Sequence, residues 1–216
     1  MWALVRYTWT DTLRSQRWVA PILCFGGIEA IVCAQTGSLL PTFATMAAVL
    51  LFIATWLSIV TINNEDPIQL SITTVCAGSQ NKVRLAKVLV AFLVAAILGV
   101  VGTIGPPVAS SSGTTITELV AGLAGQLLAA LAGVALGALC SRPLISRRAW
   151  SVLTGFAVCL GTVIVPYGPP TRQLLVVFNE TSPYALGVPL LLIGVETVIL
   201  AVTAVGASLR IAQRIT

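Results

Sequence analysis

Six long apolar runs, separated by short polar segments, constrain the fold of this chain more than any other feature. A helix needs ~20 mostly apolar residues to cross a bilayer, and every run approaches or exceeds that length. Apolar residues make up 57% of the 216 residues, charged residues make up 9%, and the mean hydropathy is +0.99. We therefore predict an all-α polytopic membrane protein with six transmembrane helices. The expected spans are Trp18–Ala34, Leu39–Ile62, Arg84–Gly105, Thr117–Leu139, Ala149–Val165 and Leu186–Leu209.

Basic residues are divided unequally between the two sets of loops that these spans create. Eleven of the twelve Lys and Arg residues precede the first span or follow the second, fourth and sixth, and only Arg172 falls on the other side. Because basic loops stay in the cytoplasm, both termini are predicted to be cytoplasmic, in a bacterial plasma membrane. The net charge of +5 is then explained by basic residues at the cytoplasmic border of the lipid bilayer, and we expect no nucleic-acid partner. The eleven are Arg6, Arg14, Arg17, Lys82, Arg84, Lys87, Arg142, Arg147, Arg148, Arg210 and Arg214.

Residues 1–17 are predicted to form an interfacial amphipathic helix that precedes the six-helix domain, residues 18–216. One helical stripe is apolar and rich in Trp, and the charged residues lie off it, which is typical of helices in the headgroup region. A secretory signal peptide cleaved after Val32-Cys33-Ala34 is a competing interpretation of this region. The stripe consists of Trp2, Val5, Trp9 and Leu13.

A polar segment, residues 63–83, separates the second and third spans and is predicted to contain a short cytoplasmic helix. Asp66 is a good N-cap residue, Pro67 suits the first helical position, and Gly78 suits the residue just after the last turn. One face of this helix is apolar. Two interpretations stay open, a segment that docks on a partner protein and an ordinary interfacial loop. The apolar face carries Ile68, Ile72, Val75 and Cys76.

The last outer connection, residues 166–185, is longer than the other two outer loops. It opens with the helix-stopping residues 166–170, Pro-Tyr-Gly-Pro-Pro. The apolar stretch 174–178 is too short to span, and the polar residues 179–183 turn the chain back. A re-entrant hairpin on the outer face is the prediction for this segment.

The fourth span carries small residues at every fourth position. Small side chains allow helices to approach closely in lipid, where no hydrophobic force drives their association. We favour packing within the fold over a subunit interface. The stripe contains Ala121, Gly125, Ala129, Gly133 and Gly137.

Three polar residues lie deep inside the predicted spans, namely Glu29, Gln126 and Glu196. A carboxylate at mid-membrane costs at least ~2.5 kcal/mol on insertion scales, so it should face a cavity, a partner or a proton. These residues either line a translocation path or are protonated or hydrogen-bonded between helices. No Lys or Arg lies at the depth of Glu29 and Glu196, so a path lined by them would favour neutral or cationic cargo.

Catalytic signatures are absent from the sequence. It contains no histidine, no phosphate-binding loop of the form G-x-x-x-x-G-K-[ST], and no Cys-x-x-Cys pair among its five cysteines. These observations predict a protein that is not an enzyme and has no catalytic residues, metal site or cofactor of its own.

The chain resembles the transmembrane (permease) subunits of ABC-2 type ATP-binding cassette exporters, particularly the short actinobacterial ones. The resemblance covers the whole length and is most specific over residues 64–69, 78–79 and 84–87. It implies that the chain pairs with a second permease subunit, identical or related, and with two copies of a separate ATPase that binds ATP and Mg. It also implies a hydrophobic or amphiphilic substrate, such as a drug, peptide or lipid. The residues that it assigns to coupling with the ATPase are Glu65, Asp66, Pro67, Gln69 and Ser79.

A second class of function stays open from the sequence. A small membrane carrier that needs no ATPase could use Glu29 and Glu196 for proton coupling, and an immunity-type membrane interaction protein would need neither. Whether an ATPase co-purifies with the chain separates these alternatives.

Overall fold

The regular secondary structure of the chain is entirely α-helical in the part that the structure describes, which confirms the all-α prediction there. The computed structural model describes residues 1–35, 38–109, 114–142, 145, 147–165, 169–180 and 186–215. The helices are α1 (Trp2–Arg14), α2 (Val19–Cys33), α3 (Leu39–Ile62), α4 (Pro67–Ala77), α5 (Gln80–Ala109), α6 (Ile116–Leu139), α7 (Arg148–Ile164), α8 (Pro170–Glu180) and α9 (Gly187–Ile215).

Four of these helices are long and apolar enough to cross a membrane, namely α3, α5, α6 and the first 25 residues of α9. The helices α1 and α2 qualify together as a fifth span, but they meet at a bend of 74°. The helix breaks there at Gln16, whose φ is +54°. With 15 and 17 residues, α2 and α7 are shorter than the ~20 that a straight span requires. The described residues thus fit a multi-pass membrane protein with four or five candidate spans, and a total of six stays a prediction.

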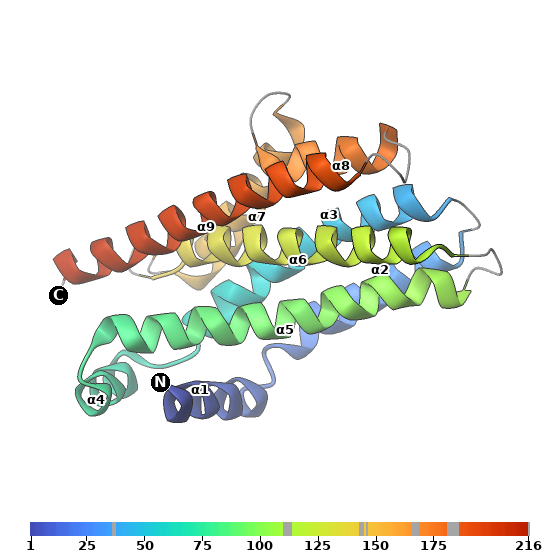
Figure 1. Ribbon diagram of the computed structural model, residues 1–216. Coiled ribbons are helices and arrows are strands. Elements are labelled where there is room, and N and C mark those ends of the chain that lie inside the picture. Colours follow the sequence, from blue (N-terminus) through green and yellow to red (C-terminus); the bar gives the residue numbers. More distant parts are fainter. Residues whose placement is uncertain are drawn as a thin grey trace.

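The helix α3 forms the centre of the bundle. Its side chains Met46, Leu50 and Leu57 are fully buried in the largest apolar cluster, together with residues of α2, α5 and α6. Figure 1 shows that α4 lies at one end of the bundle, toward which both chain termini are also directed, while α5 ends and α6 begins at the opposite end. We call these two ends the α4 end and the opposite end.

The short helix predicted between the second and third spans is confirmed as α4, and its cytoplasmic side stays a prediction. Asp66 occupies the N-cap position with extended backbone angles, although its side chain makes no capping hydrogen bond. Gly78 follows the last turn with φ +68°, a left-handed conformation that favours glycine because other residues have a Cβ. Ile68 and Val75, two residues of the predicted apolar face, have exposed side chains.

The small-residue stripe of α6 lies against α3 over the half of α6 nearer the α4 end. A Cβ built on Gly133 would lie 2.8 Å from the Cβ of Ala54, and one on Gly137 would lie 2.6 Å from the Cβ of Ser58. This close approach allows the Thr55 hydroxyl to donate a hydrogen bond of 3.0 Å to the carbonyl of Gly133. The stripe therefore faces the interior of the fold.

The helix α8 covers the same stripe near Gly125, toward the opposite end of the bundle. The ring of Phe178 occupies the space that a side chain at Gly125 would need, and Leu174 is buried beside it. Arg172 donates a hydrogen bond of 2.7 Å to the carbonyl of Ile164 and so satisfies the C-terminal end of α7. The remaining parts of the predicted hairpin, residues 166–168 and 181–185, lie outside the described residues, and its re-entrant path stays a prediction.

Candidate coupling surface and transmembrane polar residues

The exposed face of α4 is the clearest candidate for a docking surface. Ile68, Ile72 and Val75 are 73%, 60% and 81% exposed, and all three lie on one side of the helix. A groove of about 640 Å³ separates this helix from α1, and its lining includes Tyr7 and Cys76. Contiguous exposed aliphatic side chains beside a groove mark an interaction site in many proteins.

Two hydrogen bonds connect α1 to the segment that contains α4. The amide of Asn64 donates to the carboxylate of Asp11 over 2.7 Å. The amide of Gln69 donates to the phenol oxygen of Tyr7 over 3.0 Å. These hydrogen bonds therefore hold the N-terminal helix beside α4 at the α4 end of the bundle (Figure 1).

A buried ion pair fixes the N-terminal end of α4 to the bundle. The Nζ atom of Lys87 in α5 lies 2.9 Å from Oε2 of Glu65, and the two side chains are only 4% and 2% exposed. The same ammonium group is 3.5 Å from the carbonyl of Ile62 at the end of α3. This charge-assisted contact joins the last turn of α3, the start of α4 and the first two turns of α5.

The structure changes the role assigned to Glu65. We expected its carboxylate to meet a partner protein, but the carboxylate faces inward and Lys87 already binds it. Asp66, the next acidic residue, is exposed and is free to face a partner. Sequence reasoning missed Lys87 because it was counted only among the basic residues at the membrane border.

Two further polar side chains strengthen the α4 end. The amide oxygen of Asn63 accepts a hydrogen bond of 3.2 Å from the backbone N–H of Arg142. The guanidinium of Arg84 is buried and donates a hydrogen bond of 3.1 Å to the carbonyl of Ala138 at the end of α6. The ends of α3, α5 and α6 are thereby joined by polar contacts close to α4.

The other residues assigned to coupling surround α4. Pro67 is its first residue, and the side chain of Gln69 is exposed and bound to α1. Ser79 is half-buried between α4 and α5. Among the side chains whose burial is described, Asp66 and Gln69 are thus exposed, and Glu65 belongs to the supporting structure.

The three polar residues of the predicted translocation path lie in different environments within one chain. Glu29 is 9% exposed on α2 and its carboxylate packs against Gly105 of α5. Gln126 is fully buried in α6 and donates a hydrogen bond of 3.3 Å to the carbonyl of Phe43 in α3. Glu196 is exposed on α9. A single copy does not bring these side chains together.

Comparisons with known proteins add no identification: no protein-family model, curated protein or solved structure matches this chain. Within the described ranges, no group of three or more His, Cys, Asp or Glu side chains is placed to hold a metal ion. The function must therefore be inferred from the residues and their geometry.

Proposed function

We propose that this chain is the transmembrane subunit of an ATP-binding cassette exporter in a bacterial plasma membrane, and that α4 docks on a separate ATPase. The observation that carries the proposal is the combination of an exposed aliphatic face on α4 with a buried ion pair at its N-terminal end. A short helix that is exposed on one side and fixed to two long helices at its start can pass a displacement from a partner to the membrane.

The connections of α4 give this transmission a physical path. The chain runs directly from α3 into α4 and from α4 into α5, and the Glu65–Lys87 pair ties all three together. Movement of α4 would then shift the inner ends of α3 and α5 while α1 moves with it through Asp11 and Tyr7. The ATPase, present in two copies, would supply the bound ATP and Mg.

The proposed subunit has six spans, with α2 and α7 as the two short ones and α8 as a re-entrant helix on the outer side. A second permease subunit, identical or related, would complete the translocation path. The cargo would be hydrophobic or amphiphilic, and neutral or cationic, because Glu29 and Glu196 would each occur twice in a pair of copies.

The direct test is whether an ATP-binding cassette ATPase from the same organism co-purifies with this chain. The tagged wild-type chain should retain the ATPase, and Val75→Glu should lose it, because a carboxylate would enter the apolar contact. Ile116→Glu is the matched control, since Ile116 is also 81% exposed but lies in the first turn of α6 at the opposite end.

Equal retention of the ATPase by both variants would exclude docking at α4. If the wild-type chain retains no ATPase, and vesicles that contain only this chain transport the cargo, the chain is an ATPase-independent carrier. ATP-driven export that requires both proteins, and that Val75→Glu abolishes, would support the proposal.

A further inference from the structure

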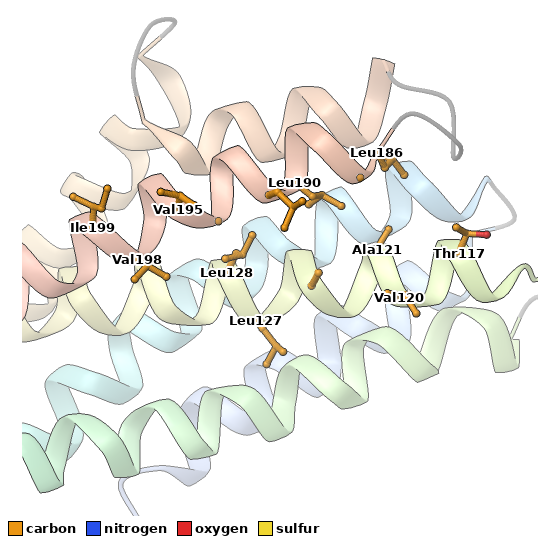
Figure 2. A pocket seen from close by; sticks show the side chains of 14 residues that line it. Thr117, Val120, Ala121, Leu127, Leu128, Leu186, Leu190, Val195, Val198 and Ile199 are labelled. Atoms are coloured by element: carbon orange, nitrogen blue, oxygen red, sulfur yellow. The ribbon is translucent and has the colours of Figure 1, made fainter.

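A groove runs between α6 and α9 on the outside of the bundle, as Figure 2 shows. It has a volume of about 800 Å³, which lies within the ~300–1,000 Å³ typical of small-molecule sites. Of the 14 residues that line it, Thr117 is the one with a polar side chain. Its walls are aliphatic side chains, including the exposed Leu191 and Val195.

Small residues hollow out this groove. Ala121 and Ala124 on α6 and Gly187 and Gly194 on α9 contribute little or no side chain to its lining. A Cβ built on Gly194 would lie 3.8 Å from the nearest side-chain atom of Leu128, an ordinary contact distance. A methyl group at this position would therefore touch Leu128, and a longer side chain would extend into the groove.

The groove has the depth of one leaflet of the bilayer. It starts at Thr117 and Gly187, in the first turns of the two helices, and ends at Leu128 and Ile199. At ~1.5 Å per residue these intervals cover about 17 Å of α6 and about 18 Å of α9. The hydrocarbon core is ~30 Å thick, so one leaflet contributes ~15 Å. A transmembrane helix of another subunit would cross both leaflets and would need a longer groove, so the length of this groove favours a lipid.

We propose that this groove binds an acyl chain of a phospholipid from the leaflet at the opposite end of the bundle. The occupant enters from the bilayer and lies parallel to α6 and α9, with its head group beyond Thr117. Only 17% of the most apolar stretch of α9 is buried within the chain, so lipid would cover surface of α9 that the protein leaves exposed. This inference depends on membrane insertion and not on the proposed ATPase partner.

The test uses the full-length protein in vesicles of phosphatidylglycerol that contain a trace of the same lipid with a diazirine on one acyl chain. After irradiation, the labelled peptides are mapped by mass spectrometry. Wild-type protein should be labelled on the facing surfaces of α6 and α9. Gly194→Leu fills the groove and should reduce this labelling roughly fivefold, which corresponds to ~1 kcal/mol.

Gly206→Leu is the matched control. Gly206 lies on the same helix, outside the groove, and a Cβ there has no atom within 4 Å. This variant should be labelled like the wild type. Ala124→Leu fills the groove from α6 and replaces Gly194→Leu if that variant does not fold.

Two results would overturn the inference. One is labelling that is equal in the wild type and in both groove-filling variants. The other is efficient cross-linking between two copies through a photoreactive residue at Val195, which would show that protein covers the groove. A second readout is thermal stability in detergent, where added phosphatidylglycerol should raise the Tm of the wild type and Gly206→Leu but not of the groove-filling variants.

Discussion

Replacing Glu65 by Gln should destabilise the protein far more than its place in a connecting segment suggests. Gln keeps the shape of the side chain but removes its charge, and it leaves the ammonium group of Lys87 buried. The amide oxygen of Gln can still accept a hydrogen bond from that group, as the carbonyl of Ile62 does over 3.5 Å, but the compensating negative charge is lost. Removing one partner of a buried pair typically costs ~3–5 kcal/mol, because the other charge is left uncompensated.

The size of the effect follows from the burial of the two side chains, which are 2% and 4% exposed. We expect Glu65→Gln and Lys87→Met each to lower the free energy of unfolding by about 3 kcal/mol. This is the low end of the range, because both groups lie near the end of the bundle. The double variant removes both charges and should lie within ~1 kcal/mol of the wild type. For a domain of about this length, 3 kcal/mol corresponds to a decrease in Tm of ~6–12 °C.

Thermal unfolding in detergent can be followed through the buried thiols of Cys140 and Cys159, which react with a fluorogenic maleimide only when the bundle opens. The other three cysteines are replaced by Ala in all variants. Asp66→Asn is the control, since Asp66 is adjacent and exposed, and it should change stability by less than ~0.5 kcal/mol. A Tm for Glu65→Gln within 1 °C of the wild type, or a double variant less stable than both single ones, would refute the reasoning.

Three other predictions follow from the packing and the topology. Gly133→Ala should lower the free energy of unfolding by ~1–3 kcal/mol, because the new Cβ would overlap α3. Gly161→Ala should not, because a Cβ there has no atom within 4 Å, and thermal unfolding compares the two variants. In a background without native cysteines, Ser38→Cys should react with an impermeant thiol reagent on intact cells and Ser71→Cys should not; the reverse result would invert the orientation. Glu196→Gln should lower the ratio of cationic to anionic amphiphile exported, whereas equal ratios in Glu196→Gln and the wild type would exclude a cargo-selecting charge there.

Features that depend on neighbouring residues were predictable from the sequence. The limits of α4 follow from Asp66, Pro67 and Gly78, because capping and left-handed backbone are local preferences. The span predicted at Leu39–Ile62 agrees with α3, and a start at Thr117 differs from that of α6 by one residue. Hydropathy identifies such helices because lipid requires a long apolar run. It says little about α2 and α7, which are short and whose number of crossings depends on how they tilt and pack.

The direction in which a polar side chain points was not predictable, because it depends on which helix packs beside it. Glu29 and Glu196 occupy similar depths when residues are counted along their spans, yet Glu29 is buried against α5 and Glu196 is exposed on α9. Counting gives the depth of a residue at ~1.5 Å per position, but rotation about the helix axis decides its neighbours. The two carboxylates should therefore not be treated as one site within a single chain.

The same reasoning explains why an acidic residue next to a predicted docking helix turned out to support it from inside. Glu65 and Asp66 are neighbours, and their side chains must point in different directions as the backbone enters α4. Lys87 lies two turns into α5, where the chain has returned to the end of α3, so its ammonium group reaches the inward-facing carboxylate of Glu65. An unpaired charge is costly at that depth of burial, so each residue makes the other tolerable there. The proposed docking face of α4 can then be largely aliphatic, with Asp66 at its edge, while the charges that hold the helix in place are buried away from that face.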